Sequence, residues 1–156
     1  MSDYGNAYYP SDLDTGRVSI PKGRYTASIV SLEINKNVRF GSFLCDVFKP
    51  EYLIDTSEHP EYEGAVVKDN GIFRYKKVDD CDYSPQKNWG FAKFLSIMKI
   101  PKLNGQLPFL KNKDVENAKV LIDIYMKIFF NDLDSEVRYP VARVIQLLEK
   151  KIDVPF

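Results

Sequence analysis

The chain has 156 residues, 44% of them hydrophobic, so it can bury the core of one globular domain without disulfides or metal ions. Its 22 Lys and Arg residues balance 22 Asp and Glu residues, which excludes a nucleic-acid role based on net charge and leaves only one based on charge distribution. The 10 Tyr and 10 Phe residues exceed what a core of this size needs, and we expect some of these rings on the surface.

The first half of the chain predicts an arm and two strands. Residues 1–20 hold tyrosines among Ser, Asp, Asn and Gly without a sustained period, which indicates an irregular N-terminal arm. The β-branched stretch 25–34 predicts a first strand, and the aromatic stretch 39–48 predicts a second strand that breaks at Pro50. The acidic stretch 50–65 contains two prolines and is typical of a solvated loop.

A third strand and a helix follow. The strand is expected within residues 66–78, where Asp69-Asn70-Gly71 suits a hairpin turn or a bulge. Asn88 is placed to cap a helix, because the apolar residues after it fall at helical spacing until Pro101. The change of period between these segments marks the boundary between strand and helix.

Two further strands complete the pattern. Residues 118–130 carry Val, Ile and Met at the even positions and predict a fourth strand, and residues 137–148 predict a fifth. Three strands, one helix and two strands are the order of the five-stranded OB barrel, whose helix lies between strands three and four. We therefore expect a mainly β, OB-like barrel over residues 21–149, followed by a C-terminal tip at residues 150–156, with a β-sandwich as the alternative.

Rings alternate with cations on the predicted strands. OB-folds bind single-stranded DNA with a basic groove and with aromatic rings, each stacked base contributing roughly 1–3 kcal/mol. On the third strand, alternation places Arg74 and Lys76 on one face, and Phe73, Tyr75 and Lys77 on the other. Rings in strands are also common core or subunit-interface residues. The candidate DNA-binding residues are Lys36, Arg39, Phe40, Phe48, Phe73, Arg74, Tyr75, Lys76, Lys77, Tyr125 and Lys127.

Motifs of catalysis are missing from the sequence. It contains no G-x-x-x-x-G-K-[ST], G-x-S-x-G or H-E-x-x-H pattern. With His59 as the single histidine and no CxxC pairing of Cys45 and Cys81, a zinc site is not expected, and both thiols are predicted to be free. A metal-dependent nuclease would need clustered carboxylates, and the acidic residues considered for that role match no known spacing. They are Asp46, Glu51, Asp79, Asp80 and Asp82. We expect neither an enzyme nor a cofactor.

The last four residues, Asp153-Val154-Pro155-Phe156, closely resemble the Asp-Ile-Pro-Phe tip of bacterial single-stranded DNA-binding proteins. The resemblance implies that Phe156, with Asp153 and Pro155, binds an apolar pocket on replication and repair partners. The stretches Pro21 to Tyr25 and Trp89-Gly90-Phe91 are similar to phage-encoded DNA-binding proteins of this fold. A short basic segment precedes the tip, so the tip either reaches a partner or packs against its own domain or a neighbouring subunit.

These observations predict a non-catalytic protein that binds single-stranded DNA without sequence preference, in replication, recombination or repair. The alternative is a phage structural or recombination accessory module whose exposed rings contact other subunits. A homo-oligomer is compatible with either role. With no apolar run long enough to span a bilayer and no signal-peptide core, we expect no membrane partner and a location in the cytoplasm of a bacterium or a phage-infected host.

Overall fold

A computed structural model of the protein describes residues 20–40, 43–76, 88–102, 107–130 and 133–150. The described chain is mainly β, as the sequence predicts. Its strands are β1 (Gly23–Phe40), β2 (Phe43–Ile54), β3 (Val66–Lys68), β4 (Ile72–Lys76), β5 (Lys119–Phe130) and β6 (Glu136–Glu149). Its helices are the 3-10 turn η1 (Pro60–Tyr62), α1 (Trp89–Ile97) and the single turn α2 (Asn112–Val115).

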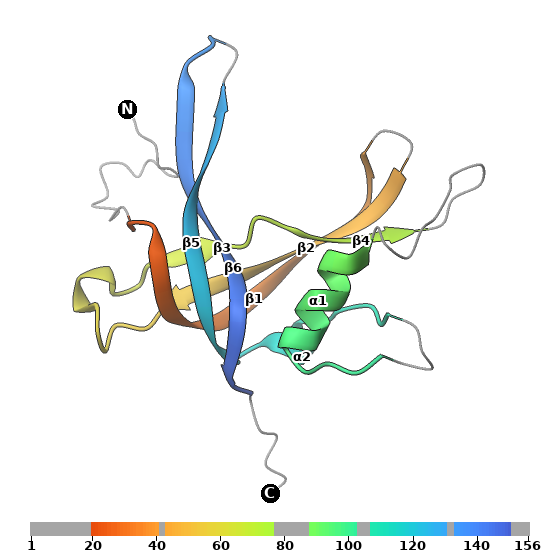
Figure 1. The fold of residues 1–156 in the computed structure, drawn as a ribbon, viewed down its shortest axis with the longest axis horizontal. Helices are drawn as coiled ribbons and strands as arrows, with labels where there is room; N and C mark the ends of the chain where they lie inside the picture. The colour runs from red at the N-terminus through yellow and green to blue at the C-terminus, as the bar shows by residue number, and fades with distance from the viewer. Residues whose placement is uncertain (1–19, 41–42, 77–87, 103–106, 131–132, 151–156) are drawn as a thin grey trace, which may run out of the picture.

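All six strands belong to one antiparallel sheet. Its order is β3-β2-β1-β5-β6, and β4 pairs with the same strand β2 that pairs with β3. Figure 1 shows two arms rising from a common base: the β5–β6 hairpin, and a second arm made of β4 with the far ends of β1 and β2. Helix α1 lies below this second arm in the same view.

The predicted third strand is in fact two strands, so the expectation of five strands was wrong. Pro50 does not end β2, as the sequence had suggested, but lies within it, and its carbonyl accepts a hydrogen bond from the Asp69 amide at 2.8 Å. Proline has no N–H to donate in return, so the ladder is weakened at this point. Gly71, two residues after Asp69, adopts a φ of +126°, and this turn redirects the chain from β3 into β4.

The described strands form an open sheet, so the predicted OB-like barrel is not closed. The end strands β3 and β6 meet at one parallel bridge between Asp69 and Ala142, and the Asn70 amide donates to the Ala142 carbonyl at 3.2 Å. We call this contact between β3 and β6 the seam. A strand as short as β3, with three residues, offers too few backbone groups to close a barrel. Helix α1 begins where predicted, but it lies between β4 and β5, and the short described connection between β3 and β4 contains no helix.

The core lies between the inner face of the sheet and α1. It is built by alternate strand residues, such as Tyr52 of β2 and Ile122 of β5, and by Phe91 on α1. Asn88 occupies the predicted N-cap position, yet its side chain bonds β4 instead of the helix. Its Oδ1 accepts from the Tyr75 amide at 2.7 Å and its Nδ2 donates to the Tyr75 carbonyl at 3.3 Å. This residue therefore ties α1 to the edge of the second arm.

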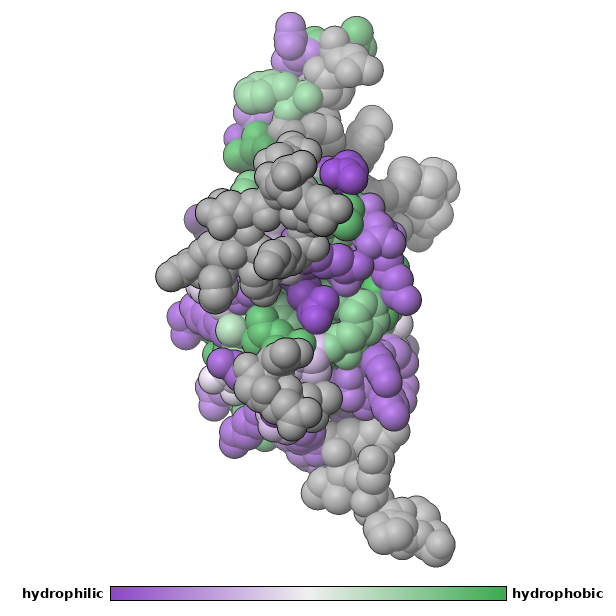
Figure 2. Space-filling view, turned by 90° about the vertical axis from the view of Figure 1, so that its right-hand side faces the viewer, coloured by the Kyte–Doolittle hydropathy of each residue, from purple (hydrophilic) through white to green (hydrophobic). Residues whose placement is uncertain are grey.

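Some hydrophobic side chains remain at the surface. Figure 2 shows hydrophobic residues in the middle of the side facing the viewer, bordered by hydrophilic ones, and others on the β5–β6 hairpin at the top. Among the described residues, Leu133 is 84% exposed, Trp89 69% and Phe130 67%. None of the helices in the described part of the chain is long and apolar enough to cross a membrane.

Candidate nucleic-acid interface

The second arm contains a small three-stranded sheet with two distinct faces. We call it the wing, and it comprises residues 33–40 of β1, 43–48 of β2, and β4. Within it Val47 faces Phe73, and Cys45 faces Tyr75. Because directly opposed residues in an antiparallel pair share a face, the odd-numbered residues of β2 and β4 point together, to the side opposite Phe48. Cys45 and Val47 on this side are themselves buried.

Three partly buried rings lie on this side, which we call the ring face: Phe43, Phe73 and Tyr75. The centroids of the Phe43 and Tyr75 rings are 5.8 Å apart with an interplanar angle of 88°, and those of Phe73 and Tyr75 are 6.2 Å apart at 73°. Such edge-to-face contacts stabilise aromatic pairs and orient each ring. The predicted separation of Phe73 and Tyr75 from Arg74 and Lys76 on β4 is confirmed.

The ring face continues toward the β5–β6 hairpin through the turn after β3. A Cβ placed on Gly71 would approach the Phe73 ring to 3.0 Å, so this ring lies against the Gly71 backbone. The neighbouring side chain, Asn70, interacts with the Tyr125 hydroxyl on β5. Burial, and then the nearby Asp69 carboxylate, raise the pKa of Tyr125, which therefore stays neutral and offers a phenol ring. The turn at Asn70 and Gly71 thus connects Tyr125 to the Phe73 ring.

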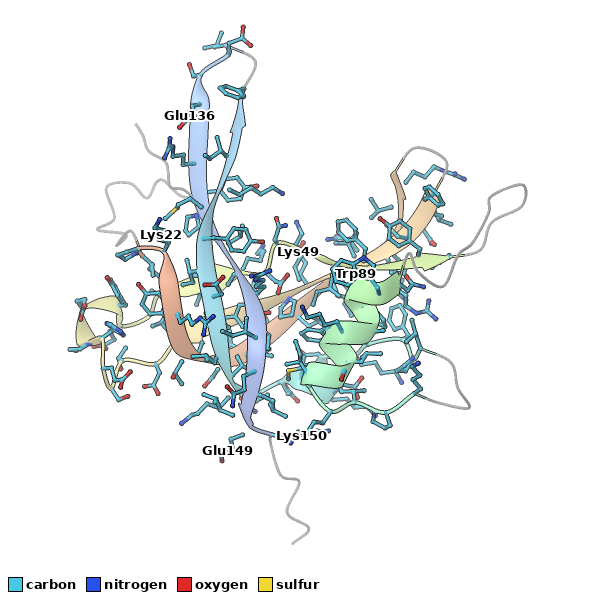
Figure 3. All side chains as sticks on the ribbon, in the orientation of Figure 1. Lys22, Lys49, Trp89, Glu136, Glu149 and Lys150 are labelled. Carbon is cyan, nitrogen blue, oxygen red and sulfur yellow. The ribbon has the colours of Figure 1, made fainter. Side chains whose placement is uncertain are left out.

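Lys49 is a cation of this surface that the candidate set from the sequence leaves out. It continues the odd-numbered series of β2 that begins with Phe43, and it is close enough to Asp69 to favour the ionised carboxylate. Figure 3 labels it near the middle of the view, between the two arms. The alternation of residues 43–49 would have identified it, had the strand not been expected to break at Pro50.

Four of the predicted cations lie on the opposite side of the wing, facing α1. Arg39 pairs with Leu44, and the even positions of β2 share a face with the core residue Phe48. The Lys36 ammonium lies 5.1 Å from the centroid of the Phe109 ring, on the same side. We call this set the cation face. Its residues are Lys36, Arg39, Arg74 and Lys76. The structure therefore separates these cations from the rings with which the sequence had grouped them.

A buried carboxylate organises the cation face. Asp46 has no exposed surface, and its oxygens lie 3.0 Å from Lys76 Nζ and 3.8 Å from an Arg74 Nη atom. The Asn37 amide donates to it at 3.1 Å. A buried charge needs partners of this kind, and here one anion is shared by two cations. Arg74 and Lys76 consequently have a structural role in the wing as well as any role in binding.

The seam contains a second buried carboxylate. Asp69 accepts a 2.6 Å hydrogen bond from the Tyr52 hydroxyl and a 2.8 Å bond from the Gly71 amide. Burial raises the pKa of Asp69 to about 6, because desolvation outweighs these two bonds and the attraction of Lys49. Desolvation and the adjacent Asp69 raise the pKa of Tyr52 well above its ordinary value. A carboxyl group next to the seam therefore changes charge near pH 6.

The remaining candidate DNA- and partner-binding residues are either buried, exposed on β5, or outside the described part of the structure. Phe48 was expected to contact DNA, but it is 0% exposed and packs against Phe91 and Phe109 at centroid distances of 5.4 and 5.2 Å. It is a core residue because it belongs to the even, inward series of β2. Lys127 is exposed on the same outward side of β5 as Tyr125. The Phe40 side chain and residues Lys77, Asp153, Pro155 and Phe156 lie outside the described part of the structure.

Of the side chains that the structure describes, no three or more His, Cys, Asp or Glu residues are grouped to hold a metal ion. Cys45 is a free, buried thiol whose pKa is raised by burial, as the sequence predicts for it; Cys81 lies outside the described residues. The chain matches no protein-family model, no curated protein and no solved structure.

Proposed function

We propose that this protein binds single-stranded DNA without sequence preference and without catalysis, in replication, recombination or repair. The observation that carries the proposal is the ring face: mutually oriented, partly accessible rings, with Tyr125 connected to them through the turn at Asn70 and Gly71. Every base offers a π-face, so a row of rings binds a single strand irrespective of its sequence. Duplex DNA does not offer unpaired base faces to such a surface.

The strand order supports the same proposal. The order β3-β2-β1-β5-β6, with β3 and β6 meeting in parallel at the seam, is compatible with a partly open OB-like fold. OB-folds bind oligonucleotides on the face of their strands 2 and 3 and with two of their loops. In the proposed fold the ring face, on β2 and β4, corresponds to that face.

The two faces of the wing suggest different roles in DNA binding for the rings and for the cations. Bases stack on Tyr75, Phe73 and Tyr125, while Lys49 and Lys127, on the same outward side, contact phosphates. The cation face attracts the polyanion over a distance comparable to the Debye length, about 10 Å at 0.1 M salt, without requiring direct contact. This distribution of charge permits DNA binding by a chain whose formal net charge is zero.

The C-terminal tip is proposed to recruit replication or repair partners. The support for this role is the resemblance of Asp153 to Phe156 to the bacterial tip described above. A ring, a nearby carboxylate and a proline that restricts the unbound chain suit capture by a small apolar pocket.

The experiment is a fluorescence anisotropy titration of labelled oligothymidine at two salt concentrations. We expect micromolar or tighter binding that weakens with salt. Tyr75→Ala should lower the affinity by roughly 5- to 150-fold, the equivalent of one lost stack, while leaving the salt dependence unchanged. Lys49→Ala should instead reduce the slope of log affinity against log salt by about 1.

Trp89→Ala is the matched control, because it removes an exposed ring that belongs to α1 and not to the ring face. It should leave DNA affinity unchanged. Circular dichroism and thermal unfolding of each variant verify that the fold is retained. Failure of the wild-type protein to bind at low salt would refute the proposal, and equal losses from Tyr75→Ala and Trp89→Ala would refute the assignment to the ring face.

A further inference from the structure

The part of the β5–β6 hairpin beyond the common base offers a free strand edge. We call residues 125–130 and 136–141 the projecting hairpin. Strand β1 pairs with β5 only from Lys119 to Ile124, so within the described residues the later part of β5 pairs with β6 alone. Figure 1 shows this hairpin standing clear of the rest of the sheet. Two strands are marginally stable by themselves in water, and an unpaired edge is a template for a further strand.

The hydrogen bond at the seam establishes which backbone groups point outward. Because the Asn70 amide donates to the Ala142 carbonyl, that carbonyl points away from β5. In an antiparallel ladder this direction alternates from residue to residue, so Pro140 and Arg138 also direct their backbone groups away from β5. Pro140 confirms the assignment, because it has no N–H to donate to its facing residue, Met126.

The same alternation defines the free edge of β5. Met126, Ile128 and Phe130 face the outward-pointing residues of β6, so their own amides and carbonyls point away from β6. This edge has an intact set of donors and acceptors, whereas the β6 edge lacks a donor at Pro140. Its side chains are also apolar: Ile128 is 49% exposed and Phe130 67%. An apolar strand edge that keeps all of its backbone donors and acceptors is characteristic of a site that pairs with another strand.

We propose that the β5 edge of the projecting hairpin pairs with the same edge of a second copy of this chain. An antiparallel arrangement centred on Ile128 places that residue opposite itself and Met126 opposite Phe130. Lys127 then lies opposite residue 129, so no lysine meets another lysine across the interface. The formal net charge of zero gives no long-range repulsion between copies. These features make the edge complementary to itself.

The inference goes beyond DNA binding and does not depend on it. The paired edge contains none of the ring-face residues, and Lys127 is the one proposed DNA contact that lies within it. The contact is small, so the dimer should be weak and concentration-dependent. Its effect is to convert two exposed hairpins into one four-stranded sheet, which covers Ile128 and Phe130.

The test is sedimentation velocity of the full chain over a concentration series up to the millimolar range. The wild-type protein should show a monomer–dimer equilibrium. Ile128→Pro removes the outward N–H of β5 without removing a donor to β6, and should raise the dimer dissociation constant by roughly tenfold or more. Arg138→Pro makes the same change on the β6 edge of the same residue pair and should leave the dimer unchanged.

Two more variants separate edge pairing from general adhesion. Ile128→Lys places like charges opposite each other and should abolish the dimer at low salt, with partial recovery at high salt. Leu133→Lys removes the most exposed apolar side chain outside the paired stretch and should have no effect. A wild-type protein that stays monomeric, or equal losses from Ile128→Pro and Arg138→Pro in folded variants, would overturn the proposal. DNA titrations below the dimer dissociation constant report separately on the ring face.

Discussion

Replacing Asp69 with Asn tests the physical account of the seam. The Asp69 carboxyl is 5% exposed, and its pKa is raised from an ordinary value of 3.8 to about 6 by burial. Because the folded state holds the proton more tightly than the unfolded chain, this group stabilises the fold fully below about pH 4. That contribution is lost as the pH rises through about 6. A difference of about two pH units corresponds to about 3 kcal/mol.

The assay is urea unfolding of wild-type protein and Asp69→Asn at several pH values between 4 and 7.5. Asparagine cannot ionise, so the free energy of unfolding of the wild type, relative to the variant, should fall by about 2–3 kcal/mol across this range. Taking the difference cancels the titration of other groups. Tyr52→Phe removes a hydrogen bond that holds the pKa of Asp69 down, and should move the fall to higher pH. A difference that does not change with pH would refute the reasoning.

The remaining predictions concern packing, backbone strain and the tip. Phe48→Ala should lower the free energy of unfolding by about 3–5 kcal/mol in chemical denaturation, because it opens a cavity under α1; a loss below 1 kcal/mol would contradict its core position. Gly71→Ala should cost about 1–3 kcal/mol, since φ is +126° and the Phe73 ring is in the way. Gly64→Ala, with φ of +79° and open space, is its control and should cost less; equal losses would show that the ring contact is unimportant. Deleting Val154 to Phe156 should leave DNA affinity unchanged or improved in the anisotropy assay, while binding to a protein that accepts the bacterial tip is lost. Loss of DNA affinity on truncation would instead assign the tip to the binding domain.

The sequence predicted the elements whose pattern is local. The even-numbered apolar residues of 118–130 identified β5 and the buried face that it presents, because the period of two in a strand follows from backbone geometry. The helical spacing after Asn88 located α1 for the same reason. Alternation also predicted correctly that Tyr75 and Arg74 lie on opposite faces of β4.

Other expectations failed because they depended on contacts between distant residues. From its local sequence, Pro50 was expected to end the second strand. Strand β2 nevertheless continues through Pro50, because the Pro50 carbonyl still accepts a hydrogen bond from the Asp69 amide. Phe48 is of a residue type that can stack on bases, so the sequence suggested a DNA contact. Its pairing with Ile72 of β4 and its contact with Phe91 of α1 are what bury it. Lys49 was overlooked as a result of the same misplaced break.

By itself, then, the sequence determined the mainly β class, the position of α1 and which residues of a strand share a face. Each of these depends on periodicity within a few residues. Only the tertiary structure decided which face is the outside, that the sheet stays open at the seam, and that the cations gather opposite the rings. Those properties depend on how β2 is paired on both of its edges and on what packs beneath it, and strand pairing between residues far apart in the chain leaves no local pattern.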